Sequence, residues 1–261
     1  MTIPKKIHWC WLSGDPLPKH LQKCVDSWQR IMPDYEIICW DKSRFDIHSI
    51  KFVEDAYNNR KWAFAADYIR LYALYTEGGI YLDSDVLVFK KFDRFLNHNA
   101  FSAIEYHPGK NMWAQNGKNT HGYNAIQAAI IGAIPNNKWI KLCMDHYTNE
   151  KKFKMTDNIV EVEIIPDALA RYAYNYFDFQ PDIPYTETQY LKDNIVIYPP
   201  KIFSTAYLGT NMQTYAMHLC DGSWYNKSDT FIQAIERKLC TSYRFFAMLH
   251  YKKRQLFNNL P

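Results

Sequence analysis

The segment that most constrains the fold of this chain is an amphipathic helix that runs into two short apolar strands with acids between them. Apolar residues recur at helical spacing over residues 61–77, and Gly78-Gly79 ends that pattern. Residues 80–82 then read as a short buried strand, and Asp83-Ser84-Asp85 separates it from a second apolar run over residues 86–89. A helix that feeds a buried strand is typical of an α/β sheet.

The rest of the chain supports this fold class. Strands are expected over residues 5–12, 35–40 and 195–198, and helices over residues 18–30, 50–58, 124–134, 137–148 and 229–257. The stretch 157–226 is rich in proline and aromatic residues and gives a mixed pattern. No linker or repeat is visible, so we expect one domain over residues 1–228, a mixed and mostly parallel sheet flanked by helices. Residues 229–261 would be a basic helical extension of the same domain.

Charge divides the chain into two parts. The 261 residues carry a formal net charge of +4. Residues 227–261 contain seven Lys or Arg and two acids, which gives +5 and leaves −1 for the rest. A near-neutral body argues against a general nucleic-acid binder. The basic segment alternates with apolar residues at helical spacing over 231–257, which suits an anionic membrane surface or a helix packed on the core, and the two alternatives stay open.

Cysteine usage and hydropathy indicate a cytoplasmic chain. The six cysteines are scattered, and none form a C-x-x-C pair or a zinc-like set, so we expect reduced thiols. The first residues lack the uninterrupted apolar stretch of a secretory signal. No run approaches the about 18 to 20 apolar residues that span a bilayer. We therefore expect a cytoplasmic protein, either free or peripheral on the inner face of the membrane.

The two acids after the buried strand are candidates for a metal site. Asp83 and Asp85 are two residues apart, so on an extended segment they point to the same side, with Cα atoms about 6 to 7 Å apart. Carboxylate oxygens suit Mg²⁺ or Mn²⁺, whose remaining positions substrate phosphates fill. The alternative is two solvated acids in a turn, but apolar runs on both sides predict burial, where unpaired carboxylates are costly.

One turn of the preceding helix carries a second polar pair. Asp67 and Arg70 are three residues apart and share a helix face. They could form an ordinary surface ion pair, which contributes little. The functional alternative is that the helix directs them at the cleft that contains Asp83 and Asp85, where Arg70 would donate to a sugar or phosphate oxygen.

At these residues the chain resembles a known family. Residues 65–86 read Ala-Ala-Asp-Tyr-Ile-Arg-Leu-Tyr-Ala-Leu-Tyr-Thr-Glu-Gly-Gly-Ile-Tyr-Leu-Asp-Ser-Asp-Val, which resembles the signature of glycosyltransferase family 32. These are DXD sugar-binding transferases related to mannosyltransferases, capsular polysaccharide transferases and the clostridial glucosylating toxins. Residues 3–14 (Ile-Pro-Lys-Lys-Ile-His-Trp-Cys-Trp-Leu-Ser-Gly), 27–41 and 218–224 (His-Leu-Cys-Asp-Gly-Ser-Trp) are similar to flanking blocks of the same family.

The resemblance implies a GT-A-like, Rossmann-type fold and a metal-dependent transfer of a hexose or N-acetylhexosamine with retention. The donor would be a nucleotide-diphosphate sugar, with a UDP-sugar favoured, and the cofactor Mn²⁺ or Mg²⁺. The acceptor would be a glycan or a lipid-linked oligosaccharide in bacterial capsular polysaccharide or lipopolysaccharide synthesis.

Roles carry over by position from the family. Asp85 would be the direct metal ligand, with Asp83 at the sugar or ribose and the metal shell, and His218 at the metal or diphosphate. Arg70 is grouped with the two acids as catalytic. The donor-binding set would comprise Trp11 stacked on the base, the strand backbone near Cys10, Asp67, Arg70, Asp83 and Ser84, with Ser223 and Trp224 closing over the leaving group.

Two other classes of function stay open from the residues alone. A haloacid-dehalogenase-like phosphotransferase also places D-x-D after a hydrophobic strand, but it needs a later acidic pair that this chain does not show clearly. A carbohydrate- or membrane-binding module without catalysis would fit the aromatic content of 16%. Hydrolysis of a phosphate ester would favour the first, and failure to bind a nucleotide diphosphate would favour the second.

Overall fold

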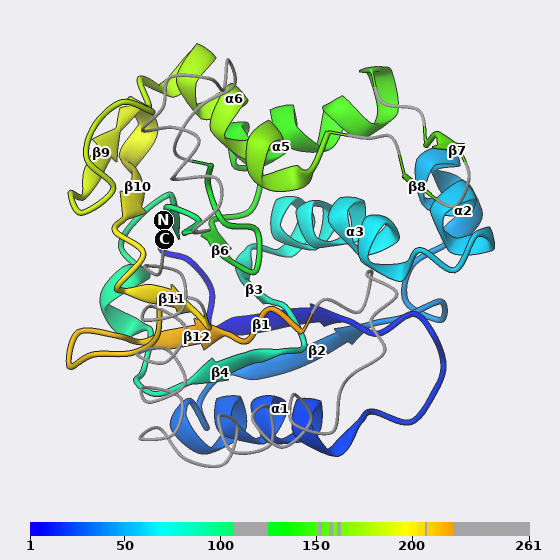
Figure 1. Cartoon of the computed structure of the whole chain (residues 1–261), viewed down its shortest axis with the longest axis horizontal. Coiled ribbons are helices and arrows are strands. Elements are labelled where there is room, and N and C mark those ends of the chain that lie inside the picture. The colour runs from blue at the N-terminus through cyan, green and yellow to red at the C-terminus, as the bar shows by residue number, and fades with distance from the viewer. Residues whose placement is uncertain (107–124, 151–152, 157–158, 161–162, 207, 222–261) are drawn as a thin grey trace, which may run out of the picture.

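Three sheets and their flanking helices make up the described part of the chain (Figure 1). The computed structural model describes residues 1–106, 125–150, 153–156, 159–160, 163–206 and 208–221. The strands are β1 (Lys6–Cys10), β2 (Glu36–Trp40), β3 (Gly79–Leu82), β4 (Val86–Val88), β5 (Ala100–Ala103), β6 (Ile130–Ala133), β7 (Met155–Thr156), β8 (Ile159–Val160), β9 (Gln189–Leu191), β10 (Ile195–Tyr198), β11 (Phe203–Thr205) and β12 (Ala216–His218). The α-helices are α1 (Lys19–Ile31), α2 (Lys51–Asn58), α3 (Trp62–Glu77), α5 (Lys138–Asp145) and α6 (Ile165–Phe177), and a π-helical turn, His146–Glu150, follows α5.

The main sheet has seven strands in the order β2-β1-β3-β6-β5-β10-β9. β1 pairs in parallel with β2 and β3, and β10 pairs in parallel with β5, whereas β6 is antiparallel to both β3 and β5. Five strands therefore share one direction, and β6 and β9 oppose them. This topology confirms the predicted α/β class with a mixed, mostly parallel sheet. The carboxyl ends of β1, β2 and β3 meet at one edge, where open α/β sheets bind ligands.

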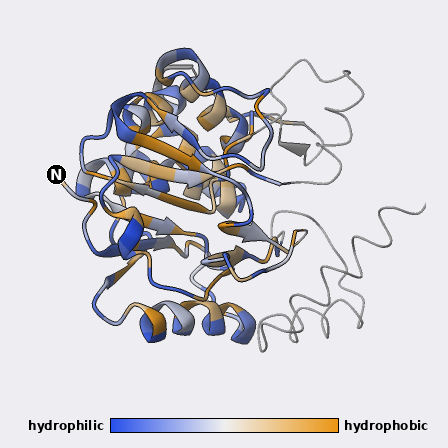
Figure 2. Ribbon diagram, turned by 90° about the vertical axis from the view of Figure 1, so that its left-hand side faces the viewer, coloured by the Kyte–Doolittle hydropathy of each residue, from blue (hydrophilic) through white to orange (hydrophobic). Residues whose placement is uncertain are grey.

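Both faces of the main sheet are covered by apolar side chains. Tyr81 of β3 packs into a core with α3, α5 and α6, whereas its neighbours Ile80 and Leu82 pack into a second core with Trp28 of α1. Figure 2 shows the apolar strands in the interior and hydrophilic residues on the outer surfaces of the helices. The alternation along β3 follows from the two-residue period of a strand, so this strand is buried on both sides.

Gly78 and Gly79 end α3 because the chain there passes close to its neighbours. Gly78 has a φ of 64° and Gly79 a φ of 115°, a backbone region that side-chain-bearing residues rarely adopt. A Cβ atom on Gly78 would lie 2.6 Å from Cδ of Pro135, and one on Gly79 would lie 2.8 Å from the carbonyl oxygen of Lys6. The glycine pair thus lets β3 start immediately beside β1.

His8 fastens this turn from the neighbouring strand. Its side chain is fully buried, Nδ1 accepts a hydrogen bond from Nε1 of Trp40 at 3.0 Å, and Nε2 lies 2.8 Å from the carbonyl oxygen of Gly78. This pattern requires a neutral ring that donates through Nε2. Burial lowers the pKa of His8, which agrees with the neutral form.

Replacing His8 with alanine is expected to cost about 2 to 3 kcal/mol of unfolding free energy at pH 7.5, because it leaves two buried polar groups unpaired. The difference from wild type should narrow as pH falls below about 6.5, since the unfolded wild-type chain then binds a proton that the folded His8 refuses. Urea unfolding at pH 7.5 and below about pH 6.5 measures the difference in unfolding free energy between the variant and the wild type. Replacement of the exposed His48 by alanine is the control. An equal loss for both variants would contradict the structural role of His8.

One expectation about the fold is wrong. Residues 124–134 do not form a helix where they are described: 130–133 are β6, which is buried along its whole length. The sequence Ile-Ile-Gly-Ala has no alternation because both faces of β6 are covered, and a short apolar run cannot separate helix from strand. The stretch 157–226 also contains α6, which begins with Pro166 in its first turn, a start signal that the sequence does carry.

Some expectations fall on residues that the structure does not describe. The basic segment 229–261 and the boundary at residue 228 lie outside the described residues. No helix in the described part of the chain is long and apolar enough to cross a membrane. The five cysteines of the described residues are free thiols, as expected.

Candidate active site

Asp83 and Asp85 lie where the chain crosses from one sheet to the other. β3 of the main sheet ends at Leu82, and β4 of a three-stranded sheet, in the order β11-β12-β4, begins at Val86. The turn between them is held by the amide of Asp83, which donates to the carbonyl of Ala129 at 2.9 Å, and by the amide of Val86, which donates to the carbonyl of Asp83 at 3.0 Å. Both acids are thereby placed at the carboxyl edge of the main sheet.

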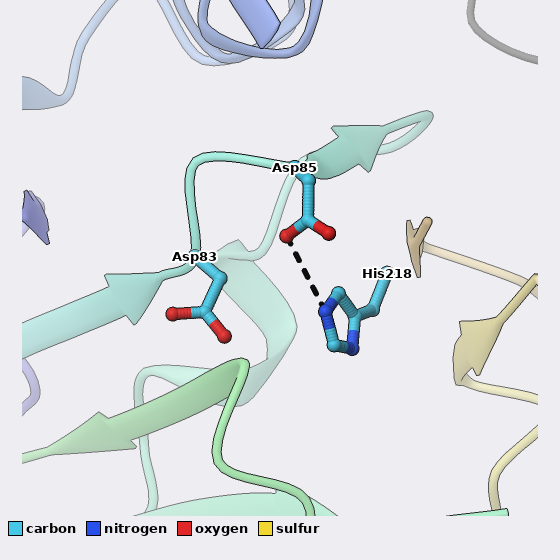
Figure 3. A group of neighbouring side chains, drawn as sticks. All are labelled: Asp83, Asp85 and His218. Carbon is cyan, nitrogen blue, oxygen red and sulfur yellow. Dashed lines mark ion pairs between the residues drawn. The ribbon is translucent and has the colours of Figure 1, made fainter. Parts of the chain in front are cut away.

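His218 is brought to the two acids by the second sheet. β12 is antiparallel to β4 with His218 opposite Val86, so the ring reaches the residue just before β4. One ligand atom each of Asp83, Asp85 and His218 lies within 4.8 Å of the others, and Figure 3 shows the three side chains facing a common space. His218 Nε2 lies 3.3 Å from Asp85 Oδ1.

These three side chains fit a divalent ion. Ligands that lie about 2.1 Å from one Mg²⁺ are about 3 to 4 Å apart, which is close to the separations of these three atoms, all within 4.8 Å. Two carboxylates and one imidazole are also a donor set that Mn²⁺ accepts.

The charges of Asp85 and His218 depend on each other. Burial alone would raise the pKa of Asp85, yet the adjacent His218 and the amide of Asp221 hold that pKa below its ordinary value. Burial likewise opposes the charge on His218, but the Asp85 carboxylate raises the pKa of His218 well above its ordinary value. A protonated ring therefore balances the Asp85 carboxylate in the metal-free protein, in the place that a metal cation would take.

Arg70 connects the helix pair to the acids. The guanidinium nitrogen Nη2 of Arg70 lies 2.9 Å from Asp67 Oδ1. Its other terminal nitrogen, Nη1, lies 3.2 Å from Asp83 Oδ1 and donates to the carbonyl of Ala128 at 2.9 Å. The guanidinium also stacks 4.7 Å from the centre of the Tyr81 ring. The side chain is only 4% exposed, so the pair with Asp67 is not a surface ion pair. All three guanidinium nitrogens have acceptors within the protein, which favours a role in holding Asp67 and Asp83 in position.

Trp11 and Cys10 lie at the carboxyl end of β1, on the same edge of the sheet as Asp83. Trp11 is half-buried, its amide donates to the carbonyl of Trp40 at 3.0 Å, and its Nε1 donates to the carbonyl of Asp15 at 2.7 Å. Unlike Trp28 and Trp40, Trp11 belongs to neither main apolar core. Burial raises the pKa of the Cys10 thiol to about 12, so this residue would act through its backbone.

Of the three other residues predicted to bind the donor, the structure describes one. Ser84 lies in the turn between the two acids and is half-buried. Ser223 and Trp224 lie outside the described residues, and their roles stay predictions.

The structure adds groups that sequence reasoning did not select. The Tyr81 hydroxyl donates to Asp83 Oδ1 at 3.0 Å, and the Asp221 amide donates to Asp85 Oδ2 at 2.8 Å. Tyr81 could have been found, because it lies two residues before Asp83 and so faces the same side of the strand. Backbone groups such as the Ala128 carbonyl and the Asp221 amide leave no signal in the sequence.

Two carboxylates and an imidazole thus lie together at the carboxyl edge of an α/β sheet, which is where open sheets of this class bind their ligands. Residues 18–102 match the family described as glycosyltransferase sugar-binding region containing DXD motif. The resemblance seen in the sequence is confirmed for this region, which spans about a third of the chain and carries the Asp83-Ser84-Asp85 motif. No match to a curated protein was found.

Solved glycosyltransferase structures are similar to this chain at low identity. PaToxG glycosyltransferase shares 18% identity over 67% of this chain and 70% of that chain, with a TM-score of 0.45. Galactosyltransferase LgtC, solved with donor and acceptor sugar analogs, shares 13% over 85% and 90%, with a TM-score of 0.44. A glycosyltransferase involved in glycosylation of the major capsid of PBCV-1 shares 13% over 94% and 98%, with a TM-score of 0.43. The α/β class with a mixed, mostly parallel sheet follows from the strand order itself.

Proposed function

We propose that this enzyme transfers a hexose or N-acetylhexosamine from a nucleotide-diphosphate sugar, with a UDP-sugar favoured, to a glycan or lipid-linked oligosaccharide. The role would lie in bacterial surface polysaccharide synthesis. The observation that carries the proposal is the cluster of Asp83, Asp85 and His218, because two of its members form the DXD motif of the matched region. A cluster of this kind suits a diphosphate held through a cation.

Asp83, Asp85 and His218 would hold the ion in this proposal. A bound Mn²⁺ or Mg²⁺ would neutralise the negative charge that develops on the departing nucleotide diphosphate. Arg70 orients both Asp83 and Asp67, because its guanidinium nitrogens lie 3.2 Å from Asp83 Oδ1 and 2.9 Å from Asp67 Oδ1. Holding these carboxylates in one geometry lowers the cost of ordering them when the donor binds.

The donor would lie along the carboxyl edge of β1 and β3. Trp11 supplies a half-exposed aromatic ring for stacking on the base, and the backbone at Cys10 supplies hydrogen-bonding groups beside it. Asp67 would accept hydrogen bonds from sugar hydroxyl groups, and Ser84, Ser223 and Trp224 complete the predicted donor set. The preference for uridine rests on Trp11.

Retention would proceed without a covalent intermediate. In this proposal Asp83 and Asp85 hold the ion and Asp67 pairs with Arg70, so none of these carboxylates is assigned as a nucleophile. The acceptor hydroxyl would then attack from the face that the diphosphate leaves. A glycosyl-enzyme adduct in intact-mass spectra would contradict this route.

Attachment to the membrane is a separate part of the proposal. It rests on the sequence of residues 229–261 alone, which lie outside the described residues. A chain that ends at residue 240 should lose binding to anionic vesicles and keep donor turnover, and retained vesicle binding would reject the membrane role.

UDP together with Mn²⁺ is expected to raise the melting temperature by about 5 to 10 °C at a hundredfold excess over Kd, because a ligand that binds only the folded state stabilises it. UDP with EDTA should have little effect. Thermal shift assays with each component alone provide the control. No shift with UDP and Mn²⁺ would favour a carbohydrate- or membrane-binding module, and hydrolysis of a simple phosphate ester would favour a phosphotransferase.

A further inference from the structure

We propose that Cys220, Asp221 and His20 are positioning residues that set the geometry of the metal ligands His218 and Asp85. This inference rests on the proposed metal-dependent function and deepens it. Residues 219–221, here called the clasp, follow β12 directly and hydrogen-bond to Asp85.

Cys220 fixes the ring of His218. The sulfur lies 3.6 Å from His218 Nδ1 and donates to the carbonyl oxygen of His218 at 3.7 Å. If the thiol proton goes to the carbonyl, the sulfur accepts from Nδ1–H, and both contacts are satisfied at once. A bound ion would replace the proton on Nε2, and the lone pair of Nε2 would then face the common space beside Asp85. Metal-binding histidines are generally oriented in this way by a partner on their second nitrogen.

The backbone of Cys220 accounts for this contact. Its φ is 54°, in the left-handed region that a cysteine rarely adopts. Such a strained conformation persists where the surroundings enforce it. Here it accompanies a side chain that turns back onto the residue two positions earlier.

The clasp also gives the two carboxylate oxygens of Asp85 different partners. The Asp221 amide donates to Oδ2 at 2.8 Å, and the Leu219 amide donates to the carbonyl oxygen of Asp85 at 3.0 Å. Oδ1 is the oxygen that faces His218, at 3.3 Å. One carboxylate oxygen is thus held by the protein and the other is directed to the ion.

Helix α1 supports the clasp from outside. His20 Nε2 lies 3.2 Å from Asp221 Oδ2, and the two side chains are 24% and 16% exposed. The same helix holds β4, because Trp28 Nε1 donates to the carbonyl of Val86 at 2.7 Å. Leu219 packs with the buried Cys24 of α1 in a small apolar cluster. α1 therefore fixes both chain segments that carry the ligands.

The test is Mn²⁺ binding without donor, followed through the electron paramagnetic resonance signal of free Mn²⁺. Cys220→Ala should raise the Kd for Mn²⁺ about tenfold or more, since loss of such a partner typically costs ten- to hundredfold in affinity. Cys220→Ser should recover most of the loss, because a hydroxyl can make the same two contacts. His20→Ala should weaken binding in the same direction, and Cys39→Ala on exposed Cys39 of β2 is the control.

A spectroscopic readout separates positioning from general damage. Bound Mn²⁺ in the wild type should show ¹⁴N coupling from the His218 imidazole, and this coupling should change in Cys220→Ala while the melting temperature stays close to that of Cys39→Ala. Wild-type affinity and unchanged coupling in Cys220→Ala would overturn the inference and leave the proposed function standing. Absence of Mn²⁺ binding by the wild type would overturn both.

Discussion

Asp85→Asn is expected to lower metal-dependent turnover of the donor by about a thousandfold, equivalent to about 4 kcal/mol of transition-state stabilisation. The asparagine keeps the shape of the side chain and an oxygen for the Asp221 amide, which donates to Asp85 at 2.8 Å in the wild type. What it loses is the charge, and with it the strongest attraction for a divalent ion. Nucleotide release and Mn²⁺ binding, measured on the same preparation, check both effects.

The matched control is Asp182→Asn, which changes an exposed acid by the same atoms. Its turnover should remain within twofold of wild type. If the Asp85→Asn variant bound Mn²⁺ and released nucleotide as well as the wild type does, the assignment of Asp85 as a metal ligand would be contradicted.

Arg70→Met is expected to reduce the unfolding free energy by about 3 to 5 kcal/mol, because it leaves buried carboxylates without their cation. Arg70 is 4% exposed and lies 2.9 Å from Asp67 and 3.2 Å from Asp83, so both acids lose a partner together. The double variant Arg70→Met with Asp67→Asn should recover part of this loss, since one uncompensated charge is removed.

Urea unfolding of the single and double variants measures this coupling. Arg30→Met, on the exposed face of α1, is the control and should change the unfolding free energy by less than about 0.5 kcal/mol. A loss below about 1 kcal/mol for Arg70→Met would show that Arg70 does not hold the acids in the folded protein.

The local parts of the site could be predicted because they follow from the periods of helix and strand. The spacing of Asp67 and Arg70 predicts one helix face, and the two side chains pair directly. The apolar runs around Asp83 and Asp85 predict burial, and Asp85 is 7% exposed. No more than a few residues separate the members of each pair, so local geometry alone brings them together.

The long-range part could not be derived from such patterns. His218 meets Asp85 across 133 positions, through the pairing of β12 with β4, and only the family resemblance indicated this residue. Cys220 and the Asp221 amide make their contacts through a backbone turn and its hydrogen bonds, which cannot be predicted from residue types. The sequence of β6 does not distinguish a strand from a helix, because a strand covered on both faces shows no alternation.

The measurement that tests the central claim most directly is nucleotide diphosphate release from a panel of UDP-, GDP- and dTDP-linked hexoses and N-acetylhexosamines. The purified chain is assayed with Mn²⁺, with Mg²⁺ and with EDTA. We expect release from at least one donor, a uridine-linked one first, that requires a divalent ion and disappears in Asp85→Asn. Folded wild-type protein that releases nucleotide from no donor, or releases it equally in EDTA, would contradict a metal-dependent glycosyltransferase built on Asp83, Asp85 and His218.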